Sequence, residues 1–173
     1  MKKLTFLPVI LIALALFSCK KDDEQKDGYL NATVNGEEYK SIKVDLFQPP
    51  HSNGGIVSFS STGKTGKEES KSISFAINNY KGAGTYYFKP DEYGKKNIAT
   101  YIYYKYGTQF DKNYTTRGDE DDDGYIIITK VKEGAKQNSV FVGTQIEGTI
   151  KFTAYMFNGE SVTVTGSFSN FSK

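Results

Sequence analysis

Apolar and polar residues alternate with a period of two along the last part of the chain. Between residues 144 and 156 one parity carries the apolar set, Ile146, Ile150, Phe152, Ala154 and Met156. A second run follows in which serine and threonine separate the apolar positions Val162, Val164 and Phe168. A period of two is typical of a strand with one buried face. The two runs, joined at an Asn-Gly pair, therefore predict a β-hairpin.

The spacing of these runs limits the loop that joins them. A two-residue turn at 158–159 would mix apolar and polar residues on one face of the hairpin. A three-residue loop over 158–160 pairs Met156 with Val162 and keeps the two sets apart, because a slip of one residue moves every side chain to the other face. We therefore predict an odd-length loop with Gly159 in a left-handed conformation.

The middle of the chain shows the same period in shorter runs. A hairpin is predicted over 29–41, with a two-residue turn at 35–36 that sets Ala32 opposite Tyr39 and a change of parity near residue 42 that indicates a bulge. Short runs predict further strands at 56–60, 72–78, 85–88, 99–106, 108–115 and 125–131. About ten short strands without a helical period predict one all-β domain over 29–173, an antiparallel β-sandwich or barrel.

The N-terminus is typical of a targeting segment. Two lysines precede an apolar run over 4–17, which is shorter than the roughly 20 residues that span a bilayer and suits a signal peptide over residues 1–18. Leu16-Phe17-Ser18-Cys19 matches a bacterial lipobox, which predicts acylation of Cys19 and a lipid anchor in the outer membrane. The alternatives are an ordinary signal peptide beside a cysteine and an uncleaved N-terminal anchor.

Charge and cysteine usage exclude several classes of function. Removal of residues 1–18 takes two lysines, so the 22 basic residues become 20 against 20 acidic ones. A neutral domain argues against nucleic acid as the partner, which would call for a basic surface. Because Cys19 is the one cysteine, its acylation leaves no disulfide, thiol nucleophile or cysteine–zinc site. Residues 19–28 lack an apolar run and are expected to form a charged, solvated tether.

Three segments carry a family resemblance. They are NATVNGEEYKS (31–41), GYIIITKV (124–131) and the closing pair GTIKFTAYMF (148–157) and SVTVTGSF (161–168). Together they resemble the small uncharacterised lipoproteins of the Bacteroidota that carry a β-rich domain of unknown function. Tyr39 stands where that family more often has tryptophan. The resemblance implies an extracytoplasmic β-domain without catalytic residues to transfer, and display on the outer face of the membrane through the acidic residues of the tether, for which a generic linker is the alternative.

An acidic segment is the sharpest candidate for a metal site. Asp119, Asp121 and Asp123, followed by Gly124, have the D-x-D-x-D-G spacing of a calcium loop, which can turn three carboxylates towards one cation. The twelfth position is Lys130 rather than glutamate, and the flanks are predicted strands, so the segment is not an EF-hand. The alternatives are a non-helical calcium loop and a solvated acidic turn without metal.

A tyrosine-rich strand is the candidate for ligand contact. Tyr101 and Tyr103 share one face of it, and Tyr104 and Tyr106 share the other. Aromatic rings stack on sugars and line ligand pockets, but they are also good strand formers that pack across a sheet. Both interpretations, a ligand platform and cross-strand packing, are open at this stage.

The sequence favours binding over catalysis. No nucleophile elbow or Ser/His/Asp set is present, so we expect a non-enzymatic binding module for a glycan, a peptide or a small ligand, with calcium as the sole cofactor considered. The first alternative is a structural or partner subunit of an envelope protein complex. A distant alternative is a small hydrolase with paired carboxylates.

Overall fold

The protein is all-β in the part of the chain that the computed structural model describes, residues 28–47, 55–63, 68–107, 112–118, 123–132, 134–137, 140–142 and 145–171. Ten of the strands in this part form one antiparallel sheet, and β9 and β10 pair separately. The strands are β1 (Tyr29–Val34), β2 (Glu37–Phe47), β3 (Val57–Gly63), β4 (Glu69–Ile77), β5 (Gly84–Tyr87), β6 (Ile98–Lys105), β7 (Lys112–Thr115), β8 (Gly124–Lys132), β9 (Ala135–Gln137), β10 (Val140–Val142), β11 (Gln145–Tyr155) and β12 (Ser161–Phe171).

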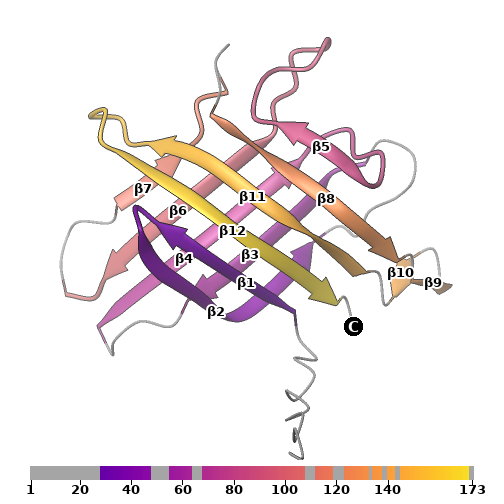
Figure 1. Ribbon diagram of the computed structural model, residues 1–173, viewed down its shortest axis with the longest axis horizontal. Coiled ribbons are helices and arrows are strands. Elements are labelled where there is room, and N and C mark those ends of the chain that lie inside the picture. The colour runs from indigo at the N-terminus through magenta and orange to yellow at the C-terminus, as the bar shows by residue number, and fades with distance from the viewer. Residues whose placement is uncertain are drawn as a thin grey trace, which may run out of the picture.

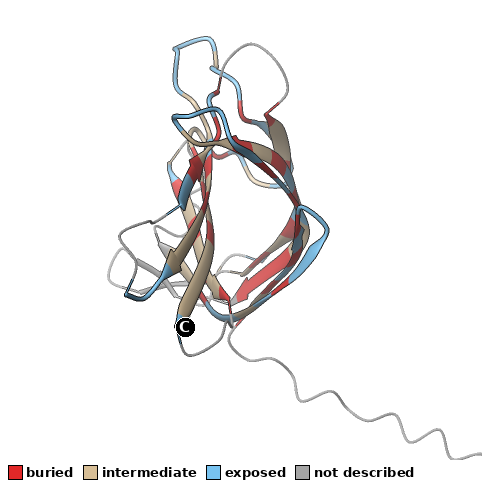
Figure 2. Ribbon diagram, turned by 90° about the vertical axis from the view of Figure 1, so that its left-hand side faces the viewer, coloured by how far each residue is buried: buried red, intermediate tan, exposed pale blue. Residues whose placement is uncertain are grey.

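Eight of these strands close into a barrel (Figures 1 and 2). Their order is β12-β1-β2-β3-β4-β6-β7-β11, and the ring closes because β11 also pairs with β12. The sequence left a sandwich and a barrel open, and this closure decides for the barrel. An eight-stranded barrel has an interior that side chains can just fill.

One wall of the barrel extends past the ring. The edge of β11 pairs with β7 at a single position, Tyr155 opposite Thr115, and with β8 from Gln145 to Phe152. Between these two partners, the backbone N–H of Thr153 donates to the carbonyl of Asp123 at 2.8 Å. The short strand β5 then pairs with β8 as the last strand of the sheet (Figure 1). The barrel is therefore closed by few backbone contacts at β7, whereas β8 and β5 widen the wall beside them.

Packed aromatic rings fill the barrel interior at its centre. Phe59, Phe75 and Phe168 come from β3, β4 and β12, and their ring centroids lie 4.8 to 5.1 Å apart. All three are buried, together with the inward-facing aliphatic residues of the other strands. Burial of each such side chain stabilises the fold by about 1.5–3 kcal/mol. At this level the interior is a packed core.

The first hairpin has the predicted geometry. Ala32 lies opposite Tyr39, and the turn residues Asn35 and Gly36 have φ angles of 49° and 85°. Such a turn matches the twist of the two strands it joins. The predicted bulge is also present, because the pairing of β2 with β3 shifts between Ser41 and Lys43.

The last hairpin confirms part of its prediction and corrects the rest. Gly159 has a φ of 88°, as expected for an odd-length loop, and the N–H of Met156 donates to the carbonyl of Glu160 at 2.8 Å. Three residues, 157–159, thus lie inside this closing pair. The predicted loop over 158–160 was wrong by one residue, since Ala154 pairs with Val162 rather than Val164. A loop that begins one residue earlier shifts the pairing partner of each β11 residue by two positions. Because this shift is even, every side chain stays on its predicted face.

A bulge in β8 sets how that strand meets β11. Glu147 pairs with Lys130, and the next residue, Gly148, pairs with Ile128, so Thr129 is the extra residue of β8. The hydroxyl of Thr129 donates to the carbonyl of Glu147 at 3.1 Å. This bulge fixes the register of all later pairs between the two strands.

Candidate binding groove on the outer wall

The strands β2, β1, β12, β11, β8 and β5 form one wall of the protein (Figure 1). Two rows of side chains cross the outside of this wall. The first outer row consists of six cross-strand neighbours: Glu38, Thr33, Thr165, Lys151, Tyr125 and Tyr87. The second outer row lies beside it and consists of Lys40, Asn31, Ser167, Thr149, Ile127 and Thr85. Threonine, serine and asparagine dominate the centre of both rows, so this wall presents hydroxyl and amide groups to solvent.

A groove of about 510 Å³ lies over these rows. Its floor is shallow because the central side chains are short, and longer ones, Glu38, Lys151 and Tyr125, stand along it. The inward-facing row beneath it, Tyr39, Ala32, Gly166 and Ile150, also contributes to the floor. This volume is in the range of small-molecule ligand sites, roughly 300–1,000 Å³.

A pair of tyrosines ends the first outer row. Tyr87 and Tyr125 meet edge to face, with ring centroids 6.4 Å apart and an angle of 73° between the rings. Tyr87 is 49% exposed, and the ammonium group of Lys89 lies 5.4 Å from its ring centroid. An exposed aromatic face beside hydroxyl and amide groups is the combination that recognises a sugar ring, which has an apolar face and a polar rim.

The tyrosines predicted from the sequence lie elsewhere. Tyr101 is 5% exposed and packs in the barrel 5.9 Å from the ring of Tyr114, and burial raises its pKa to about 12. The hydroxyl of Tyr103 donates to a Glu69 carboxylate oxygen at 2.8 Å. Tyr104 and Tyr106 pair with each other on the outside, with centroids 4.8 Å apart. Tyr101 and Tyr103 thus lie on one face of β6, Tyr104 lies on the other with Tyr106 directly after the strand, as their parity predicts, and none of the four lines the groove.

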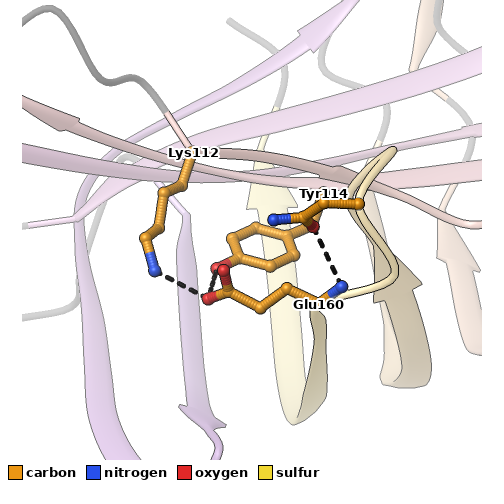
Figure 3. Close-up of polar contacts among 4 residues, drawn as sticks. Lys112, Tyr114 and Glu160 are labelled. Carbon is orange, nitrogen blue, oxygen red and sulfur yellow. Dashed lines mark hydrogen bonds and ion pairs between the residues drawn. The ribbon is translucent and has the colours of Figure 1, made fainter.

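A polar cluster closes the barrel where β7 barely pairs with β11 (Figure 3). We call Lys112, Tyr114 and Glu160 the seam cluster: the Lys112 ammonium and the Tyr114 hydroxyl both donate to Oε1 of Glu160 at 2.6 Å. These bonds, from Lys112 first and then Tyr114, hold the pKa of Glu160 below its usual range. Burial is the largest cause that raises the pKa of Tyr114. The neighbouring Arg117 guanidinium lies 4.1 Å from the ring centroid of Tyr155.

One residue of the predicted calcium loop is described. Asp123 is 5% exposed, and its Oδ2 accepts a hydrogen bond of 2.6 Å from the N–H of Gly118. Asp119 and Asp121 lie outside the described residues. The described part of the chain contains no group of three or more His, Cys, Asp or Glu residues that could hold a metal ion. Calcium binding by the whole loop stays a prediction.

The predicted lipidation site also lies outside the described residues. The described residues begin at Gly28, so they include neither Cys19 nor the rest of the tether before Gly28. The signal peptide and the anchor therefore stay predictions. Over the described ranges, no helix is long and apolar enough to span a bilayer.

The groove was missed because it depends on which strands are neighbours. Tyr87 belonged to the tyrosine-rich part of the sequence, and Tyr125 has the opposite parity to the buried Ile126 and Ile128. Parity shows that Tyr125 faces outwards, but only the pairing of β5 with β8 brings Tyr87 beside it.

Comparison with known proteins leaves the fold and the groove as the basis for a functional argument. No protein-family model, curated protein or solved structure matches the chain. The resemblance to lipoproteins of the Bacteroidota stays a prediction.

Proposed function

We propose that this protein is a lipid-anchored, non-catalytic binding module of the bacterial outer membrane that holds a carbohydrate chain in the outer groove. The observation that carries the proposal is the pair of outer rows, which present hydroxyl and amide groups and of which the first ends at Tyr125 and Tyr87. Sugar hydroxyls can exchange hydrogen bonds with threonine, serine and asparagine, while the apolar face of a ring stacks on tyrosine.

The carboxylate inventory of the groove favours binding over cleavage. Glycoside hydrolysis uses two carboxyl groups on either side of the scissile bond. Of the described residues that line the groove, Glu38 alone carries a carboxyl group. This carboxylate forms an ion pair of 2.8 Å with Lys40 on the exposed wall. We therefore propose a role in which the protein holds the glycan without cutting it.

The predicted anchor gives this binding a location. A triacylated Cys19 would keep the barrel at the membrane, because more than one acyl chain makes anchoring stable. The residues between Cys19 and Gly28 can span at most about 30 Å when fully extended. A glycan held in the groove would thus be kept close to the cell surface or to the periplasmic face, whichever face carries the anchor.

Titration of the full-length chain in detergent with a panel of neutral and acidic polysaccharides, followed by affinity electrophoresis and calorimetry, tests the proposal. Tyr125→Ala is expected to weaken binding about tenfold, which corresponds to roughly 1.4 kcal/mol of lost aromatic contact. Tyr106→Ala is the matched control, because Tyr106 is 57% exposed, directly follows β6 and does not line the groove. Melting temperatures of both variants show whether they fold.

The outcomes separate the hypotheses. Loss of affinity in folded Tyr125→Ala with parent-like binding by Tyr106→Ala supports the groove. The reverse pattern would return the site to the tyrosines of β6. Absence of binding across the whole panel overturns the proposal and favours the alternative, a partner subunit of an envelope complex.

A further inference from the structure

A second hollow lies past the Tyr125 end of the groove. The two share no described lining residue, but Tyr87 of the hollow pairs with Tyr125 of the groove across β5 and β8. The hollow has a volume of about 250 Å³ and lies where the ends of β4, β5 and β6 meet. Thr85 and Tyr87, the last residues of the two outer rows, are part of its lining. A chain that follows the first outer row past Tyr125 therefore arrives at this hollow.

The lining of the hollow is cationic. Lys81, Lys89 and Lys95 contribute three positive charges, and Asp91 contributes one negative charge. None of the three lysines forms an ion pair with another residue in the described ranges. We call these three residues the lysine triad. The described lining of the groove carries one charge of each sign, Glu38 and Lys151, so the net positive charge lies at the hollow.

Asp91, the single carboxylate among the described residues of the hollow, already has partners. Oδ1 of Asp91 accepts hydrogen bonds from the backbone N–H groups of Tyr93 and Lys95, at 2.9 and 2.8 Å. The N–H of Asp91 also donates to the carbonyl of Lys95 at 2.9 Å. The carboxylate of Asp91 thus stabilises the loop that contains Lys95 and holds this lysine at the hollow.

Hydrogen bonds also hold the other sides of the hollow in place. Asn97 accepts a bond of 2.8 Å from the N–H of Asn78 and donates one of 2.8 Å to the carbonyl of Tyr87. The hydroxyl of Tyr86 donates to the carbonyl of Gly82 at 2.7 Å and accepts from the N–H of Lys81 at 3.0 Å. The Tyr86 ring stacks on buried Tyr80 at 5.7 Å. A site held in this way needs little rearrangement to accept a ligand.

We propose that the ligand is an acidic polysaccharide, whose carboxylate or sulfate group lies at the lysine triad while the adjoining sugar ring lies on Tyr87 and Tyr125. This inference rests on the proposed function and names its class of glycan. Lysine ammonium groups bind anions as point charges and do not demand one oxyanion geometry. A neutral glycan would gain nothing from the triad. An acidic one gains an attraction that salt weakens, because the lysines are exposed.

Matched pairs of polysaccharides test the inference. The full-length chain is titrated with polygalacturonate and its fully methyl-esterified form, and with dextran sulfate and dextran. At least one acidic member is expected to bind about tenfold more tightly than its neutral partner, as three exposed charge contacts allow. Substitution of the triad by glutamine, Lys81→Gln with Lys89→Gln and Lys95→Gln, is expected to abolish that preference.

The control removes the same number of charges elsewhere. Lys43→Gln, Lys130→Gln and Lys132→Gln change exposed lysines of β2 and β8 that do not line the hollow. Equal loss of the preference in this control would show general attraction to the protein and overturn the inference. Equal binding of acidic and neutral members, sensitive to Tyr125→Ala, would overturn the inference and leave the glycan module standing. No binding to any polysaccharide would overturn both.

Discussion

A glycine in β11 links the fold to the groove, and its replacement tests that link. Gly148 lies directly after the point where β8 gains Thr129. A Cβ on Gly148 would lie 2.1 Å from the backbone oxygen of Ile127 and 2.8 Å from Cζ of Phe168. Carbon and oxygen atoms normally stay more than about 3 Å apart. Because the nearer atom belongs to the backbone of a paired strand, Gly148→Ala must move β8 away from β11.

The size of the effect follows from this crowding. Overpacking of this kind costs about 1–3 kcal/mol in the free energy of unfolding. For a domain of this size that lowers the melting temperature by roughly 2–12 °C. Thr149 and Lys151 follow Gly148 in the same strand, opposite Ile127 and Tyr125. A displaced β8 therefore also disturbs both outer rows, and polysaccharide affinity should fall together with stability.

The assay pairs thermal melts with polysaccharide binding. Gly159→Ala is the control, because Gly159 has a φ of 88° and no atom lies within 4 Å of an added Cβ. Its left-handed backbone alone costs about 1–2 kcal/mol when it carries alanine. The control is therefore expected to lose about as much free energy of unfolding as Gly148→Ala. Because the change lies at the tip of a hairpin, away from the outer rows, the control should bind polysaccharide as the parent does. If Gly148→Ala melts like the parent, or binds like the parent after losing stability, the reasoning is refuted.

Two further changes test the seam cluster and the predicted calcium loop. Hydrogen bonds to Lys112 and Tyr114 hold the pKa of Glu160 below its ordinary value of 4.5, so its carboxylate stabilises the fold above that pH and the contribution is lost as the pH falls through the folded-state pKa. The stability of the parent relative to Glu160→Gln should thus shrink in a melt series from about pH 7 to about pH 3, and a constant difference would contradict this. If the predicted calcium loop binds the ion, calcium should raise the melting temperature of the parent but not that of Asp121→Ala. A parent whose melting temperature does not rise with calcium rules the site out.

Strands and tight turns could be predicted because their signals lie within a few residues. Asn35 and Gly36 adopt the positive φ angles that a two-residue hairpin turn needs, and Gly159 adopts the left-handed conformation of an odd-length loop. Alternation also assigned faces correctly, since Ile146 and Ile150 are buried while Lys151 is exposed. These features depend on backbone sterics and on a period of two, and both are visible in the sequence alone.

Register and closure could not be predicted in the same way. The predicted and observed registers of the last hairpin bury the same residues, so the hydrophobic pattern does not distinguish them. The turn decides, because the N–H of Gly159 donates to the carbonyl of Met156 at 3.0 Å and places the loop one residue earlier. Closure depends on contacts between distant segments, such as Lys112 with Glu160. No local pattern marks either residue of that pair.

The packed interior explains why we place the site on the outer wall. Phe59, Phe75 and Phe168 occupy the centre of the barrel, and an eight-stranded ring leaves little further room there. A ligand of several sugar units then has to lie across the outside, where neighbouring strands place their side chains about 5 Å apart. The outer rows present groups at that spacing over six strands, from Glu38 to Tyr87. The bulge beside Gly148 sets the register in which Tyr125 lies opposite Lys151 and Ile127 opposite Thr149, so this irregularity joins Tyr125 and its neighbour Tyr87 to the hydroxyl groups of the rows.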